Sequence, residues 1–150
     1  QRLILRTYTQ MIRATDAVTT KMHRHLAEHG LTISQFGVLE ALYHKGPLCQ
    51  REIGLKILKT SGNMTTVIDN LEKRALVVRE KDMEDRRRIS LKLTEKGFTL
   101  INTIFPIHAE TAEKTFAVMN GRELATLGDL LKKVGKASAE KTTAVERRPL

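Results

Sequence analysis

The chain has 150 residues, of which 41% are hydrophobic, so it can form a packed core and wholesale disorder is excluded. No apolar stretch approaches the roughly 18–20 residues of a membrane-spanning helix, and the single cysteine, Cys49, excludes an internal disulfide framework. We therefore expect a cytoplasmic protein without a membrane partner. Lys and Arg number 26 against 17 acidic residues, and the resulting net charge of +9 suits a polyanionic partner.

The first part of the chain predicts two helices. Over residues 3–29, apolar side chains recur every three or four positions, as on one face of an amphipathic helix, and Gly30 would end that helix. Thr32 and Gln35 then have the spacing of a capping box, which predicts the start of a second helix that stops at Gly46.

The middle of the chain has the pattern of a helix-turn-helix. A short helical pattern runs from Cys49 to Leu58, the polar residues 60–63 interrupt it, and a second helix runs to about Arg74. Two short helices joined by a tight polar turn, the second with polar residues on its free face, are typical of that motif.

A β-hairpin is predicted directly after these helices. Residues 77–79 read as a strand, and residues 89–93 alternate apolar and polar side chains with a period of two. The segment between the strands is charged and ends in three consecutive arginines. From Lys45 to Lys96 there are 13 basic and 8 acidic residues, a net charge of +5. A helix-turn-helix followed by a hairpin predicts a winged helix over 32–94.

Two more helices and a tail are predicted after the wing. Thr94 and Asn120 are the expected caps, and the first of these helices carries Pro106 in its interior. Apolar periodicity stops after Gly135, so we expect a frayed tail over 137–150.

The predicted fold class is mainly α with a small β-hairpin wing, in a single domain spanning residues 1–150. The helices at 3–29 and 95–136 flank the winged helix, and their apolar faces need a surface to cover them. If those faces met a second copy, the product would be a two-fold dimer.

Several motifs, at matching spacing, resemble those of one family. They are Leu31-Thr32, Gly46-Pro47-Leu48, Asp69-Asn70-Leu71-Glu72, Asp82-Met83-Glu84-Asp85-Arg86-Arg87 and Leu93-Thr94-Glu95-Lys96-Gly97. From about residue 3 to 136 the chain resembles the MarR (multiple antibiotic resistance regulator) family of winged helix-turn-helix transcription factors. It departs from the family pattern at Ala75, where Gly is usual, and at Thr66, where many members carry Arg.

The resemblance implies a homodimeric repressor or activator that binds double-stranded DNA at a pseudo-palindromic operator. Its recognition helices would occupy successive major grooves and its wings the neighbouring minor grooves. A small phenolic or anionic ligand would bind between the dimer helices and the winged helix.

Candidate DNA-binding residues lie in two places. The start of the recognition helix presents small or hydrogen-bonding residues, and the free amide groups of a helix N-terminus also suit a phosphate. Arginine on a wing suits the strongly negative, narrow minor groove. The helix residues are Ser61, Gly62, Asn63, Thr65 and Thr66; the wing residues are Arg86, Arg87 and Arg88, with Arg87 at the tip and Asp82 and Asp85 shaping the loop. The alternatives are a plain helix cap and a solvated hairpin tip.

Cysteine and histidine allow further readings. Cys49 falls near a helix N-terminus, so it is either a redox sensor or a small buried hydrophobe. His25 and His29 are four residues apart, a spacing that can hold zinc, but no cysteine lies nearby in the sequence. His108 falls on an apolar helix face and is read as a core or interface residue. We predict no cofactor and no metal.

No catalytic motif is present, so the sequence predicts a DNA-binding regulator rather than an enzyme. We expect its operator binding to respond to a small aromatic ligand or an oxidant. Two alternatives remain open: an architectural DNA-binding protein with little sequence preference, and a helical protein-interaction module.

Overall fold

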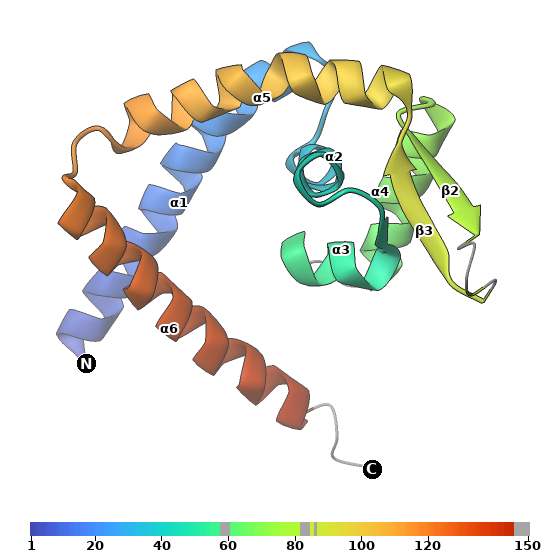
Figure 1. Cartoon of the computed structure of the whole chain (residues 1–150). Helices are drawn as coiled ribbons and strands as arrows, with labels where there is room; N and C mark the ends of the chain where they lie inside the picture. The colour runs from blue at the N-terminus through green and yellow to red at the C-terminus, as the bar shows by residue number, and fades with distance from the viewer. Residues whose placement is uncertain (58–60, 82–84, 86, 146–150) are drawn as a thin grey trace. The chain divides into compact units, whose positions relative to one another are not determined.

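The structure is a computed structural model that describes residues 1–57, 61–81, 85 and 87–145, with the backbone alone for 61–62 and 139–145. Its elements are α1 (Arg2–Glu28), α2 (Ile33–Lys45), β1 (Leu48–Cys49), α3 (Gln50–Ile57), α4 (Ser61–Lys73), β2 (Val77–Lys81), β3 (Ile89–Leu93), α5 (Glu95–Phe116) and α6 (Gly121–Val145) (Figure 1). The predicted fold class, mainly α with a small β wing, is confirmed. The chain divides into two compact units, residues 1–112 and 113–150.

The turn between α1 and α2 forms as the sequence predicts. Gly30 has a φ of 62°, and its N–H donates to the Ala27 carbonyl at 2.9 Å while the Leu31 N–H donates to Leu26 at 3.0 Å. These two bonds satisfy the last carbonyls of α1 in a Schellman motif. Thr32 and Gln35 then form both hydrogen bonds of the capping box that starts α2.

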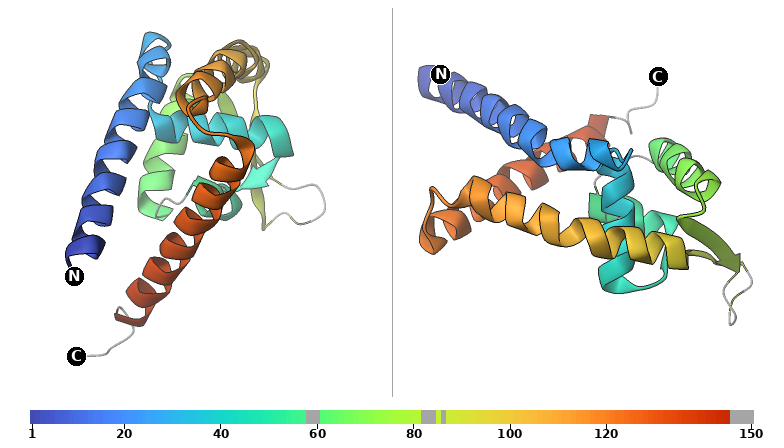
Figure 2. Two further views of the ribbon diagram at one scale, coloured as in Figure 1. Left: turned by 90° about the vertical axis from the view of Figure 1, so that its left-hand side faces the viewer. Right: turned by 90° about the horizontal axis from the view of Figure 1, so that it is seen from above.

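The wing is a three-stranded antiparallel sheet in the order β1-β3-β2. Val77 pairs with Leu93 and Leu48 pairs with Leu91, which places β3 in the middle. In the right-hand view of Figure 2, β2 and β3 extend beyond the helices of the first unit. The periodicity predicts that Cys49 lies in a helix, whereas it lies in β1. Two residues are too short to show an alternating pattern, and only pairing with β3 defines them as a strand.

The helix-turn-helix forms, with one boundary moved. The polar residues 60–63 predict a break between the two helices, but α4 begins at Ser61. The core of the first unit is mostly aliphatic and joins α2, α3, α4, the sheet and α5. Its fully buried side chains include Leu39, Ile53, Met64, Ile68, Leu71, Leu91 and Ile101. Because each of these elements contributes buried side chains to one cluster, α3 and α4 cannot turn about their axes without exposing apolar surface.

A network around Thr94 joins the wing to α5. The Thr94 hydroxyl donates to the Ala75 carbonyl at 2.7 Å and accepts the Gly97 N–H at 3.0 Å, so it caps α5 as predicted. The Thr94 N–H donates to the Leu76 carbonyl at 3.1 Å. Gly97 packs directly on that carbonyl, and a Cβ added at Gly97 would lie 1.9 Å from the Leu76 oxygen. Only glycine fits this crossing of α5 over the chain that enters β2.

Ala75 leaves α4 in the left-handed region, with a φ of 55°. This conformation costs an L-residue with a Cβ about 1–2 kcal/mol, and glycine adopts it freely. Replacement of Ala75 by glycine would remove that cost, but glycine also has more conformational freedom in the unfolded chain, which offsets part of the stabilisation. We therefore expect Ala75→Gly to raise the free energy of unfolding by roughly 0.5–1 kcal/mol, measured by urea denaturation.

The matched control is Ala125→Gly, on the exposed surface of α6. There the same replacement removes a strong helix former from a helix interior and should lower stability by up to about 1 kcal/mol. If both variants are destabilised, the left-handed turn at Ala75 carries no appreciable strain.

The second unit contains the end of α5 and the whole of α6. Asn120 and Glu123 form reciprocal side-chain-to-backbone hydrogen bonds of 2.8 and 3.0 Å, so the predicted cap of α6 is confirmed. The frayed tail expected over 137–150 is wrong as far as Val145, because α6 continues to that residue. Ala, Lys and Glu are strong helix formers and extend a helix without an apolar stripe. Residues 146–150 lie outside the described residues.

The predicted position of Pro106 is confirmed, since it lies inside α5. Over the described residues, no helix combines the length and the apolar composition needed to cross a lipid bilayer.

Candidate nucleic-acid interface

The outer face of α4 is polar where the helix begins. Asn63, Thr65 and Thr66 are exposed, while Met64 and Ile68 are fully buried on the inner face. The core therefore determines which side of α4 faces outward. Ser61 and Gly62 lie in the first turn of the helix, and their side chains are outside the described part of the chain.

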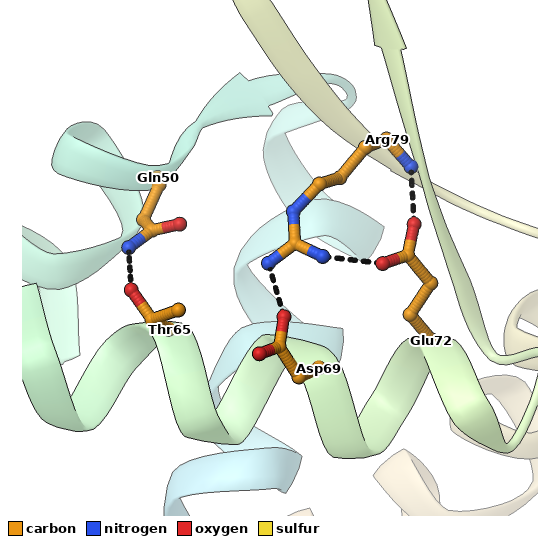
Figure 3. Close-up of polar contacts among 5 residues, drawn as sticks. All are labelled: Gln50, Thr65, Asp69, Glu72 and Arg79. Carbon is orange, nitrogen blue, oxygen red and sulfur yellow. Dashed lines mark hydrogen bonds and ion pairs between the residues drawn. The ribbon is translucent and has the colours of Figure 1, made fainter.

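Thr65 is held in place from the preceding helix. The Gln50 amide, on the first residue of α3, donates to the Thr65 Oγ1 at 2.8 Å (Figure 3). The bond joins the two helices of the motif at the exposed end of α4. Nothing in the sequence marks Gln50 as part of the site, because no local pattern relates residues fifteen positions apart.

Arg79 connects the first strand of the wing hairpin to α4. Its guanidinium donates to Asp69 Oδ1 at 2.6 Å and to Glu72 Oε2, and its backbone N–H donates to Glu72 Oε1 at 3.2 Å (Figure 3). Burial acts to lower the pKa of Arg79, but the two carboxylates outweigh it and leave the pKa raised. Arg79 therefore stays charged, and its charge is compensated within the protein.

The hairpin tip is shaped by Asp85. Its carboxylate accepts the Arg87 N–H at 3.0 Å, and its carbonyl accepts the Arg88 N–H at 2.8 Å. Arg87 and Arg88 are both exposed, so neither is held in the core. The predicted site residues Asp82 and Arg86 lie outside the described residues.

Cys49 is half-buried in β1, one residue before α3. Its N–H donates to Glu52 Oε2 at 2.7 Å, so the carboxylate caps the start of α3. Hydrogen bonds from the backbone and the side chain of Cys49 lower the pKa of Glu52, and the charges of Arg88 and Lys56 act in the same direction. A redox role for Cys49 stays a prediction.

Two histidines meet where α1, α2 and α5 come together. His25 Nε2 and His108 Nδ1 are 3.1 Å apart, and the His108 ring lies on Phe36 with centroids 4.2 Å apart. In the part of the chain that the structure describes, no three His, Cys, Asp or Glu side chains gather as a metal site would require. The zinc reading of His25 and His29 therefore gains no support.

The half-buried histidines should make the free energy of unfolding depend on pH. Burial lowers the pKa values of His23, His25 and His108 from their ordinary value of 6.5; Glu28 opposes this at His25, whereas neighbouring histidines reinforce it at His25 and His108. Below about pH 6.5 the unfolded chain binds more protons than the folded one, so the free energy of unfolding should fall as the pH falls and level off above that value.

Thermal melts between about pH 5.5 and 7.5 test this expectation, because carboxylates stay ionised over that range. His108→Gln keeps a polar side chain but removes one titrating group, so its midpoint should change less with pH than that of the parent. Equal pH dependence in both proteins would assign the effect to other groups.

The comparisons with known proteins match both the motifs and the fold. The model of the MarR family matches residues 31–89. The HTH-type transcriptional regulator MhqR of Bacillus subtilis (strain 168) is 39% identical over 131 residues, which cover 87% of this chain and 90% of MhqR.

Two solved structures have the same fold. A structure of Bordetella bronchiseptica BpsR, described by its regulation of DNA binding by 6-hydroxynicotinic acid, has a TM-score of 0.76 and 25% identity over 85% of this chain and 91% of its own. NadR in complex with 4-hydroxyphenylacetate has a TM-score of 0.72 and 28% identity over 85% and 91% of the two chains.

Proposed function

Because this chain belongs to the MarR family of DNA-binding transcriptional regulators, we propose that it is a homodimeric repressor with a specific operator, released by a small aromatic ligand. The observation that carries the proposal is one rigid core that presents both the polar start of α4 and the arginine-bearing hairpin to the outside. Its curated relatives are regulators rather than enzymes.

In this proposal α4 enters a major groove and the hairpin reaches the adjacent minor groove. Asn63, Thr65 and Thr66 face the base edges or the phosphates, with Ser61 and Gly62 beside them. Arg87, with its backbone held by Asp85, places its guanidinium in the minor groove, and Arg86 and Arg88 serve the flanking phosphates.

The operator is found by selecting bound sequences from a random duplex pool. The affinity of the selected duplex is then compared with that of a scrambled duplex over a range of salt concentrations. We expect a specificity ratio of roughly a thousandfold or more at physiological salt. A ratio near one would favour an architectural DNA-binding protein, and no binding at low salt would favour a helical interaction module.

The dimer is supported by apolar side chains that the single chain leaves exposed. On α1, Leu3 is 75% exposed and Ile4 is 71% exposed; on α6, Leu130 is 56% and Leu131 is 48% exposed. Exposed apolar surface of this kind marks interaction sites. Sedimentation should show a dimer at micromolar concentration, and Leu131→Glu should shift it toward monomer. A monomeric parent at about 100 µM would contradict the dimer.

The ligand is supported by two of the similar structures, because BpsR is described by its regulation by 6-hydroxynicotinic acid and NadR was solved with 4-hydroxyphenylacetate. Each of these compounds has an aromatic ring with a hydroxyl and a carboxylate group, so we infer an aromatic ligand of the same class. Such a ligand should weaken operator binding, and by linkage the operator should weaken ligand binding by the same factor. A panel of phenols, aromatic acids and quinones tests this, and unchanged operator affinity across the panel would contradict it.

A further inference from the structure

Arg79 holds together two elements that the DNA-binding surface needs. Asp69 and Glu72 are three residues apart on α4 and therefore lie on one face of that helix. The Arg79 side chain bridges both of them, and its backbone N–H adds a third bond to Glu72 (Figure 3). Strand β2 is thus bonded to α4 by its main chain and by its side chain at the same residue.

Arg79 is also tied to the strand that returns from the hairpin tip. It pairs with Leu91 of β3, and Leu91 is fully buried in the core. A rotation of the hairpin away from α4 would have to break the bonds to Asp69 and Glu72. The bridge therefore sets the angle between the recognition helix and the wing.

We propose that Arg79 is a positioning residue for operator binding, which sets the wing against α4 through Asp69 and Glu72 without touching DNA. The inference rests on the proposed function, because it assumes that α4 and the wing contact neighbouring grooves of one operator. These grooves have a fixed separation in B-form DNA, so a wing at the wrong angle loses its contacts when α4 keeps its own.

The charges at this bridge distinguish a positioning role of Arg79 from a direct contact between Arg79 and a DNA phosphate. One arginine faces two carboxylates, so the cluster carries a net charge of −1 and repels DNA. Simple electrostatics predicts that removal of Glu72 strengthens DNA binding. Positioning predicts that it weakens specific binding. The two explanations differ in sign.

A purely structural role also makes a different prediction. The side chains of Arg79, Asp69 and Glu72 are 27%, 45% and 36% exposed. Ion pairs as exposed as these contribute little to global stability. Loss of the bridge should therefore change operator affinity more than it changes the thermal midpoint.

The experiment uses the full chain with Arg79→Met, Glu72→Met and the double variant, and measures affinity for the selected and the scrambled duplex. Each single variant should weaken selected-duplex binding by roughly 3- to 30-fold, a range typical of residues that couple sites without contacting the ligand. The double variant should be no weaker than the worse single one, because both remove the same bridge. The salt dependence of specific binding should be unchanged.

Glu80→Met is the matched control. Glu80 lies on the same strand as Arg79, and its carboxylate forms an ion pair with Lys92 at 2.8 Å. The variant therefore loses the same charge as Glu72→Met and an ion pair of the same kind, without affecting α4. Its operator affinity should be unchanged or slightly increased. Arg79→Lys keeps the charge but loses the fork that reaches two carboxylates, and it should retain only part of the affinity.

Amide hydrogen exchange gives a second readout that does not depend on DNA. In Glu72→Met the Arg79 amide should exchange faster, while the amides of α4 stay protected. Three results would overturn the proposal: unchanged or tighter operator binding by Glu72→Met, a salt slope lowered by about one unit in Arg79→Met, and equal losses in Glu80→Met. If the parent itself shows no preference for any duplex, the proposed function fails first, whatever the exchange data show.

Discussion

Replacement of Arg87 by alanine should weaken operator binding by roughly 1–3 kcal/mol, which is about five- to more than a hundredfold in affinity. The Arg87 backbone is held by the Asp85 carboxylate, while its side chain is exposed and can enter a minor groove. The salt slope should fall by about one unit, because one contact with the strongly negative groove is lost. Stability should change by less than about 0.5 kcal/mol, since an exposed tip side chain contributes little to folding.

Lys132→Ala is the charge-matched control for this measurement. Lys132 is exposed on α6, far along the chain from the wing, and its loss lowers the net charge by the same amount. Binding should be nearly unaffected in this variant. If Arg87→Ala and Lys132→Ala weaken binding equally, the overall positive charge accounts for the effect, and Arg87 has no special role.

Gly97→Ala should lower the free energy of unfolding by about 2–3 kcal/mol. The added Cβ would meet the Leu76 carbonyl oxygen at 1.9 Å, far inside van der Waals contact. That oxygen belongs to the main chain and accepts the Thr94 N–H, so it cannot move aside as the end of a flexible side chain could. Urea denaturation of parent and variant measures the loss.

Gly121→Ala is the control for Gly97→Ala. Among the described residues, no atom lies within 4 Å of a Cβ at Gly121, the first residue of α6, and alanine is the better helix former. Its stability should be unchanged or slightly higher. A destabilisation of Gly97→Ala below about 0.5 kcal/mol would mean that α5 can shift away from Leu76 without appreciable cost.

Sequence alone determined the features whose signals are local. The glycine turn at Gly30, the capping box at Thr32 and Gln35, and the cap at Asn120 were all predicted and are confirmed. Each depends on a few consecutive residues, whose hydrogen-bonding groups lie within one helical turn of one another. Periodicity likewise predicted the long helices and the two hairpin strands, because one apolar face repeats along each element.

The candidate site was predicted only in part. The exposed face of α4 and the wing arginines follow from the polar pattern and from the family motifs. The bridge from Arg79 to Asp69 and Glu72 could not be predicted, because the sequence does not indicate which acidic residues an arginine in a charged segment contacts. Gln50 was missed for the same reason, and α6 runs past the last apolar repeat because helix propensity continues beyond it.

Only the tertiary structure decided which distant residues come together. His25 and His108 are 83 residues apart, and β1 exists as a strand only because Leu48 and Cys49 pair with β3. These contacts depend on how the apolar faces of α2, α4 and α5 pack into one core. The free energy of that packing is shared among many side chains, so no short stretch of sequence specifies it.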